Sequence, residues 1–246
     1  MPPEQKYILE KTQDGSISFL NTEFNESYHS IIGAYHEALH KHVLACKVDE
    51  LALNRVKNPN NKDPIKILDV CFGLSYNSGV AIEKIWEINP EQKIEIIGLE
   101  SDIGIIQKIP ELEIPENYEI VHKLMTNLSN LVLNLEQDSP KSKKLELKEE
   151  NIDITIYIDD ARNSIKSLES NYFDGIFFDP FSPKSCPILW TEEFIADVVK
   201  TAKPGAYIST YSSARIAKDG FNNAGCKLFE GPKLNRRNGG VLARKN

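Results

Sequence analysis

The chain of 246 residues lacks the motifs that would assign it at once to a metal-binding, disulfide-stabilised or nucleotide-hydrolysing class. Its four cysteines form no C-x-x-C pair and its histidines no H-E-x-x-H pair, so neither a metal site nor a disulfide framework is predicted. No G-x-x-x-x-G-K-[ST] segment occurs, which disfavours a P-loop enzyme. Without an N-terminal apolar segment or a run of about 18 apolar residues, we expect a cytoplasmic protein that does not enter a membrane.

Charge is plentiful but unevenly distributed. The net charge is −7, yet the segment from Arg215 to Asn246 carries eight basic and two acidic residues, a net charge of +6, so the first 214 residues carry −13. A basic tail on an acidic body could face a polyanion such as a nucleic acid. Composition alone, however, favours solvated surface charge.

Apolar runs alternate with longer amphipathic segments through most of the chain. Five β-branched runs predict strands at 65–71, 94–100, 154–159, 175–179 and 206–211. The segments around them predict helices at about 77–89, 102–108, 124–136, 161–169 and 191–202. This alternation is typical of a parallel sheet covered by helices on both faces, and the length suits one substantial α/β domain.

The two ends of the chain differ from this pattern. Residues 6–20 predict a β-hairpin around Asp14-Gly15, and an amphipathic helix is expected over 28–46, with its histidines at the surface or in caps. We therefore predict an N-terminal extension, residues 1–60, that packs on a core domain, residues 61–246. The remaining expected elements are a charged, solvated insertion at 137–151, a helix at 213–223 and an antiparallel closing pair at 226–230 and 241–245.

The first predicted strand leads into DVCFGLSYNSG, residues 69–79, where a nucleotide-binding turn would bring backbone close to a ligand. Only Gly73 stands at its centre, with Cys71 and Ser75 on either side. A strand-to-helix turn with a single glycine is as often structural as ligand-binding. The turn alone is therefore a weak indication of a nucleotide site.

Four successive predicted strands end near acidic residues, at the edge of a doubly wound sheet where ligands collect. Glu100 could accept both hydroxyls of a ribose, or it could cap the next helix. Asp160 could accept from an adenine amino group, and it could also cap the helix that begins at Ala161. Asp179 taken alone could be a turn residue. The recurrence favours a ligand rich in hydroxyls and amines over a phosphate.

The segment FFDPFSPKSCPILW, residues 177–190, is the most unusual stretch of the sequence. An apolar run ends in Asp179, and three prolines follow within eight residues. Proline fixes its own backbone and restricts the residue before it, so this loop is expected to be stiff. A stiff acidic loop at the end of a buried strand is suited to hold a reacting group in place.

These segments together resemble the MnmC-type methyltransferases, which make 5-methylaminomethyl-2-thiouridine at the tRNA wobble position. The resemblance spans most of the chain and is carried by the DGS turn, EFNESYHS (23–30), DVCFGLSYN (69–77), FFDPFSPKSCPILWTEEF (177–194), KPGAYISTYSSA (203–214) and GPKLNRR (231–237). The block from Phe177 is its most specific part. The chain departs from the family at the turn, where G-F-G-T-G is replaced by Cys71-Phe72-Gly73-Leu74-Ser75.

The resemblance implies a Rossmann-like class I fold that binds S-adenosylmethionine (SAM), with a mostly parallel sheet, an antiparallel C-terminal strand, and the N-terminal hairpin and helix. It implies that SAM lies across the strand ends, with Gly73 and its neighbours under the methionine portion, Glu100 at the ribose, and Asp160 with Ala161 at the adenine. The full set of implied cofactor-binding residues is Asp69, Phe72, Gly73, Ser75, Asn77, Glu100, Asp160, Ala161 and Asp179.

The implied reaction places Asp179 beside the transferable methyl group and the incoming amine as the catalytic residue. Phe181 and Pro183 would form a wall for the base, and Tyr28 would close the site from the N-terminal side. Basic residues in a turn-rich, exposed connection near the C-terminus are predicted to contact tRNA phosphates: Lys233, Arg236 and Arg237.

The sequence thus predicts a SAM-dependent enzyme that N-methylates the 5-aminomethyl group of (2-thio)uridine in tRNA. The 246 residues are too few to hold also the FAD oxidoreductase domain of the bifunctional relatives, so a stand-alone methyltransferase is expected. One alternative is a polyamine aminopropyltransferase or another small-amine transferase, although those enzymes usually carry a glycine-rich turn. Another is a non-catalytic protein that binds tRNA or SAM without turnover.

Overall fold

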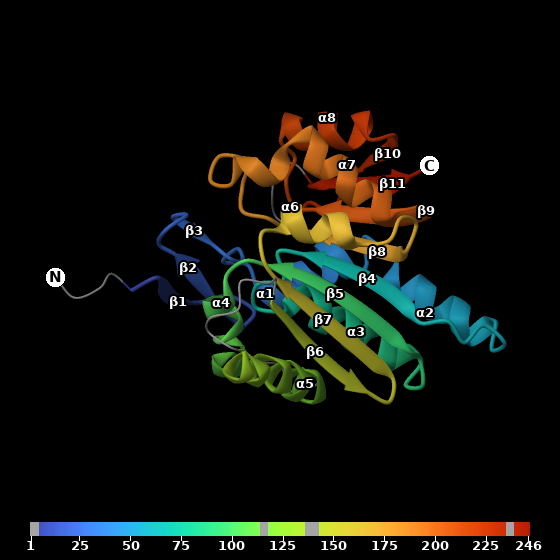
Figure 1. Cartoon of the computed structure of the whole chain (residues 1–246), viewed down its shortest axis with the longest axis horizontal. Coiled ribbons are helices and arrows are strands. Elements are labelled where there is room, and N and C mark those ends of the chain that lie inside the picture. Colours follow the sequence, from blue (N-terminus) through green and yellow to red (C-terminus); the bar gives the residue numbers. More distant parts are fainter. Residues whose placement is uncertain (1–4, 114–117, 136–142, 235–238) are drawn as a thin grey trace.

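The computed structural model describes residues 5–113, 118–135, 143–234 and 239–246. Within these residues, an eight-stranded sheet runs through the molecule in the order β10-β11-β9-β8-β4-β5-β7-β6 (Figure 1). Its strands are β4 (Ile65–Val70), β5 (Ile94–Glu100), β6 (Lys143–Glu149), β7 (Ile152–Ile158), β8 (Phe173–Phe178), β9 (Ala202–Thr210), β10 (Cys226–Glu230) and β11 (Val241–Lys245).

The five central strands of this sheet, β9, β8, β4, β5 and β7, are parallel to their neighbours. The edges are antiparallel: β6 pairs with β7 at one side, and β11 pairs with β9 and β10 at the other. This is the Rossmann-like, mostly parallel sheet with an antiparallel C-terminal strand that the sequence predicts. The chain leaves β4 first toward β5 and later toward β8, so the switch point of the topology lies between β4 and β8.

Helices cover both faces of the sheet, because alternate residues of each strand point to opposite sides. Ile65 and Ile67 of β4 belong to one core, and Leu68 and Val70 to the other. The first core packs against α2 (Val48–Lys57), α3 (Tyr76–Ile88), α4 (Ile103–Ile106) and α5 (Glu119–Asn130), and the second against α6 (Ala161–Ser164), α7 (Glu192–Thr201) and α8 (Arg215–Asn223). Thr191 is the N-cap of α7, since its hydroxyl accepts from the Phe194 amide at 3.3 Å.

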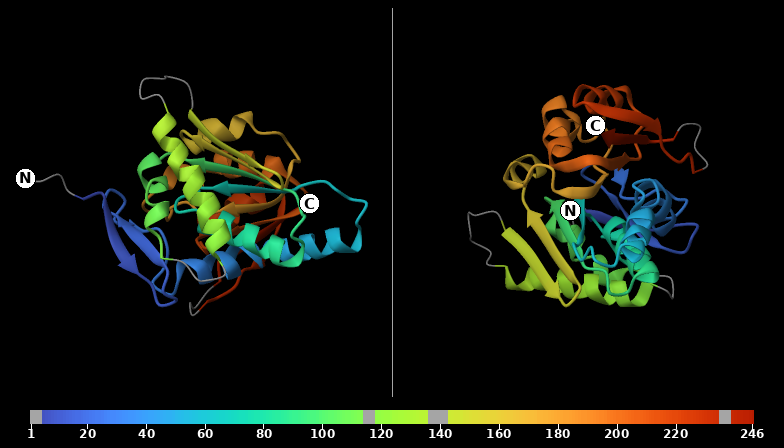
Figure 2. Two further views of the ribbon diagram at one scale, coloured as in Figure 1. Left: turned by 90° about the horizontal axis from the view of Figure 1, so that it is seen from below. Right: turned by 90° about the vertical axis from the view of Figure 1, so that its right-hand side faces the viewer.

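The N-terminal residues form a separate three-stranded antiparallel sheet of β1 (Tyr7–Lys11), β2 (Ile17–Asn21) and β3 (Glu26–Ser27). The predicted hairpin is confirmed, and its turn uses Gly15 at a φ of 85°. Figure 2 shows this small sheet at one end of the molecule, beside the strand-and-helix body. The division into 1–60 and 61–246 stays a prediction.

Two of the predicted elements need correction. The helix expected over 28–46 begins only at Ala34, and it consists of a short α1 (Ala34–Glu37) and a π-helical turn, η1 (Ala38–Val43). Residues 143–149 of the expected solvated insertion instead form β6, which pairs along the whole of β7. Leu145 explains the pairing, because it is buried between charged neighbours that point outward. Residues 137–142 of that segment lie outside the described residues.

No helix in the described part of the chain is long and apolar enough to cross a membrane. Over the same residues, no group of three or more His, Cys, Asp or Glu side chains could hold a metal ion.

Candidate active site

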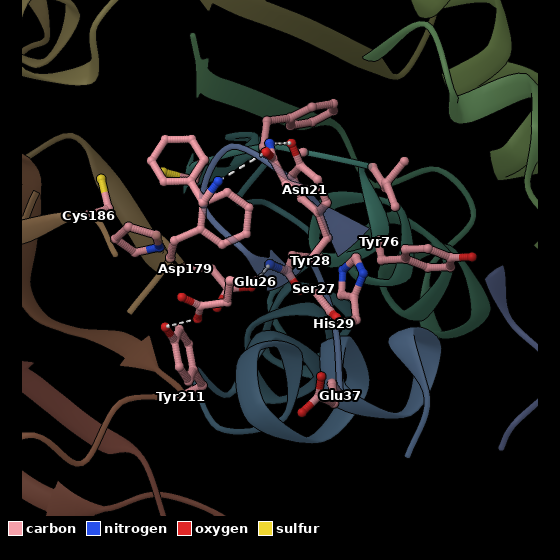
Figure 3. A pocket seen from close by; sticks show the side chains of 18 of the residues that line it. Asn21, Glu26, Ser27, Tyr28, His29, Glu37, Tyr76, Asp179, Cys186 and Tyr211 are labelled. Atoms are coloured by element: carbon pink, nitrogen blue, oxygen red, sulfur yellow. Dashed lines mark hydrogen bonds between the residues drawn. The ribbon is translucent and has the colours of Figure 1, made fainter. Parts of the chain in front are cut away.

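A cavity of about 340 Å³ opens at the carboxyl ends of the parallel strands, beside the switch point between β4 and β8. Six segments that are distant in sequence line it: residues 21–31 of the N-terminal sheet and its following loop, Glu37 with η1, the turn from β4 into α3, the end of β5 with the two residues after it, the loop after β8, and Tyr211 after β9. Figure 3 shows side chains from these segments around the cavity, among them Tyr28, Asp179 and Tyr211.

The turn between β4 and α3 has left-handed backbone at three positions, of which only one is a glycine. Cys71, Gly73 and Ser75 all have positive φ, of 68°, 53° and 67°. These are the three positions at which the MnmC-type pattern carries glycine. Non-glycine residues pay a steric penalty of roughly 1–2 kcal/mol in this region, because the Cβ atom approaches the following carbonyl oxygen. The turn has therefore kept its shape at the expense of backbone strain.

Replacing Cys71 or Ser75 by glycine is expected to raise the free energy of unfolding by about 0.5–1 kcal/mol per site, since the relieved strain exceeds the added chain entropy of glycine. Denaturant titration measures this. Asn25, with a φ of 50°, supplies the control, because asparagine tolerates this region and Asn25→Gly should change little. A loss of stability in both glycine variants would show that the turn is unstrained.

Glu100 ends β5 and fixes this turn. Its Oε2 accepts from the Gly73 amide at 2.8 Å, and its Oε1 accepts from the Asp102 amide at 2.8 Å. Burial raises the pKa of Glu100 to about 7, although the two backbone N–H donors act in the opposite direction. Each carboxylate oxygen has a second acceptor site, so Glu100 can still accept two ligand hydroxyls.

Asp179 follows β8 and lies in a polar cluster at the floor of the cavity. Its Oδ2 accepts from the Asn77 amide group at 3.0 Å and lies 3.4 Å from Nε2 of His42. Burial acts to raise the pKa of Asp179, but His42 and Asn77 outweigh it and hold the pKa below the ordinary aspartate range. The carboxylate is therefore ionised at neutral pH and is poised to attract a cation.

His42 corrects the prediction that the N-terminal histidines lie at the surface or in caps. Its side chain is only 2% exposed and contacts Asp179, which is far away in the sequence. The π-helical turn η1 carries both His42 and Lys41 to the cavity wall. Such turns recur at functional sites, but a hydrophobic repeat does not distinguish them from an ordinary helix.

The N-terminal sheet is tied to the proline-rich loop across the mouth of the cavity. The Glu26 carboxylate accepts from the Ser182 amide at 3.1 Å, and its Oε1 lies 3.5 Å from the Tyr211 hydroxyl (Figure 3). The rings of Phe24 and Tyr28 contact the ring of Phe181 in tilted arrangements, with centroid distances of 4.8 and 5.0 Å. These contacts make a largely apolar entrance with one acidic residue.

A second contact holds the loop after β8, because the Trp190 indole N–H donates to the Phe181 carbonyl at 2.8 Å. Phe24 and Glu26 were not among the predicted site residues. Both belong to the EFNESYHS segment that carries the resemblance, and this signal could have identified them.

The structure gathers seven of the predicted site residues at the cavity: Tyr28, Phe72, Gly73, Asn77, Glu100, Asp179 and Phe181. Six others do not line it: Asp69, Ser75, Asp160, Ala161, Pro183 and Lys233. Arg236 and Arg237 lie outside the described residues. The binding roles of all these residues stay predictions.

Three of the residues outside the cavity wall have clear structural partners. Asp69 is fully buried and accepts from the Ser78 hydroxyl at 2.7 Å. Asp160 caps α6 by accepting from the Arg162 amide at 2.9 Å, which is the capping role considered for it. Lys233 lies 3.4 Å from Glu230, so its ammonium group is paired on the surface.

Comparison with known proteins identifies the class. The family described as S-adenosyl-L-methionine-dependent methyltransferase matches residues 122–246, about half of the chain. The chain belongs to this family of SAM-dependent methyltransferases. SAM is accordingly its cofactor, as predicted.

The particular relatives agree with the MnmC-type resemblance. The crystal structure of MnmC2 from Aquifex aeolicus superposes with a TM-score of 0.77 and 29% identity, covering 98% of this chain and 71% of that one. The bifunctional tRNA 5-methylaminomethyl-2-thiouridine biosynthesis protein MnmC of Leptospira interrogans is 24% identical over 92% of this chain. An uncharacterized protein of Methanocaldococcus jannaschii is 25% identical over 99% of it. The chain spans 61% of the archaeal protein and 33% of the Leptospira protein.

The residues at the cavity fit this cofactor. A carboxylate at the end of β5 with free acceptor capacity suits the two ribose hydroxyls, and the left-handed turn exposes backbone beside it. The buried side chains of Phe72 and Leu74 give the same wall an apolar character. Phe72 itself packs against Gly98 of β5, where a Cβ atom would lie 2.8 Å from the Phe72 ring.

Proposed function

We propose that this protein is a tRNA methyltransferase that transfers a methyl group from SAM to the amine of 5-aminomethyl-(2-thio)uridine at the wobble position. The observation that carries the proposal is the Asp179 carboxylate at a cavity that is also lined by the aromatic rings of Phe24, Tyr28 and Phe181. A carboxylate attracts an alkylammonium group, and aromatic side chains accept an unstacked base. The names of the MnmC relatives support the same substrate.

SAM, when bound, supplies a methyl group on a positively charged sulfur, which a nitrogen nucleophile can displace in line. The substrate ammonium has no free electron pair, so it must first lose a proton. Asp179 orients the ammonium and accepts this proton transiently. Because its pKa is low, Asp179 is a weak base, and the proton passes on to water.

With SAM bound, the new nitrogen–carbon bond would replace the carbon–sulfur bond, whose electron pair would stay on sulfur. The product amine carries the positive charge, which Asp179 continues to face. Phe24, Tyr28 and Phe181 hold the base side of the substrate and exclude water. The protein contributes chiefly position and electrostatics, which suits a displacement of this kind.

Incubating the protein with SAM and tRNA that carries the aminomethyl group tests the proposal. Nucleoside mass analysis is expected to find one added methyl group on the wobble uridine, and none when SAM is omitted. The same tRNA with an unmodified wobble uridine is the control substrate and should stay unchanged. Methylation of free polyamines but not of tRNA would overturn the proposal in favour of a small-amine transferase.

A further inference from the structure

His42 is a buried imidazole beside the proposed reaction centre that the mechanism so far does not use. Both ring nitrogens have partners: Nε2 lies 3.4 Å from Oδ2 of Asp179, and Nδ1 lies 2.9 Å from the Ser209 hydroxyl oxygen. The ring packs edge-on against Phe177 at 5.7 Å. Three elements, η1, β9 and the end of β8, thus fix its place and orientation.

The partners of the ring determine which nitrogen carries hydrogen. An ionised carboxylate can only accept hydrogen bonds, so Nε2 must be protonated to contact Asp179 favourably. In the neutral ring Nδ1 then accepts from the Ser209 hydroxyl, and in the cationic ring it donates to it. In both states Nε2 donates toward Asp179. His42 is therefore not placed to take a proton from the substrate amine.

The two oxygens of the Asp179 carboxylate differ in their contacts. Oδ2 is contacted by His42 of η1 and by Asn77 of α3. No hydrogen bond to Oδ1 occurs among the described residues, so this oxygen is available to a ligand in the cavity. Besides His42 and Asp179, the cavity is lined by the charged or titratable side chains of Glu26, His29, Glu37, Lys41, Glu100 and Asp102, among others. Of these, Glu37 and Lys41 pair with each other.

We propose that His42 is a positioning residue for methyl transfer: it donates to Oδ2 of Asp179 and so presents Oδ1 as the single, ionised acceptor for the substrate ammonium. The inference rests on the proposed function. It also narrows the substrate class, since an oxygen held in this way favours a cationic amine over a neutral hydroxyl or an anionic group.

Two substitutions at His42 separate this role from the alternatives. His42→Gln keeps an N–H donor near the position of Nε2, and His42→Phe keeps the ring volume without a donor. We expect kcat within about tenfold of wild type for the Gln variant and about 100-fold lower for the Phe variant, with the Kd for SAM within about twofold in both. His122→Gln is the control, because His122 lies on α5 and bonds to the Ile109 carbonyl away from the cavity.

Each other outcome decides against the proposal. Equal inactivity of the Gln and Phe variants, both folded by circular dichroism, would mean that the imidazole itself exchanges protons with the substrate. Wild-type kcat in the Phe variant would mean that the ring only fills space.

A measurement that needs no turnover separates this inference from the proposed function. Nitrogen-15 NMR of the histidine rings should find the His42 proton on Nε2 in the wild type, and Asp179→Asn should perturb that signal. A neutral ring protonated on Nδ1 instead would overturn the inference whatever the activity. If Nε2 is protonated but no tRNA is methylated, the proposed function fails while the pairing of His42 with Asp179 stands.

Discussion

Asp179→Asn is expected to lower kcat for tRNA methylation by about 10²- to 10⁴-fold, while the Kd for SAM stays within about twofold of wild type. The substitution keeps the shape of the side chain but removes the charge that attracts the ammonium and accepts its proton. Single-turnover kinetics with saturating SAM measures the chemical step, and calorimetry measures binding.

Asp153→Asn is the matched control, since Asp153 is an exposed aspartate near the start of β7, at the other end of the sheet from the strand ends that carry the cavity. It should leave kcat unchanged. Near wild-type turnover in Asp179→Asn would reduce Asp179 to a turn residue, and a large loss of SAM affinity would move its role from the substrate to the cofactor.

Glu100→Gln is expected to weaken SAM binding by about 30- to 300-fold, because two charge-assisted hydrogen bonds to the ribose become neutral ones. In the wild type, burial raises the pKa of Glu100 to about 7. The carboxylate therefore gains its charge as the pH rises through about 7, and SAM should bind more tightly at pH ~8 than at pH ~6. The variant should lose this pH dependence, which calorimetry at several pH values can follow.

In the protein without SAM, ionisation of Glu100 lowers the free energy of unfolding as the pH rises, whereas it strengthens SAM binding. Its pKa is raised from 4.5 to about 7, so the folded state holds the proton more tightly than the unfolded state. Its contribution to stability is greatest below the unfolded pKa and is lost as the pH rises toward about 7. Glu100→Gln should flatten this decline, and Glu146→Gln, at an exposed glutamate, should not.

For the binding experiment, a Kd for SAM of the wild-type protein that stays constant between pH ~6 and pH ~8 would contradict a Glu100 that is buried and titrates near pH 7.

The sheet could be predicted from the sequence because each of its central strands is a β-branched apolar run with a helical segment after it. β4, β5 and β8 were predicted to within two residues at each end. β6 could not be recognised, because LELKE has a single buried leucine among charges and depends on β7 for its pairing. The short β3 and the π-helical η1 also depend on tertiary contacts more than on local propensity.

The acidic residues of the site could also be predicted, since the carboxyl ends of parallel strands lie at the same edge of a sheet. Glu100 and Asp179 lie at the cavity for this reason. Of the N-terminal residues at the cavity, only Tyr28 was predicted, through the resemblance, because the hydrophobic pattern of residues 23–46 does not indicate which part of the sheet they cover. Glu26 with Ser182 and His42 with Asp179 are pairings that only the folded chain reveals.

The contact between Glu26 and Ser182 joins residues that are 156 positions apart. A ribosome that adds roughly 5–20 residues per second needs about 8–30 s to make the intervening chain. During that time the cavity lacks its proline-rich loop, and the apolar rings of Phe24 and Tyr28 have no Phe181 to cover them. The site is thus completed late in synthesis, and in a chain that stops before residue 182 Glu26 lacks this partner.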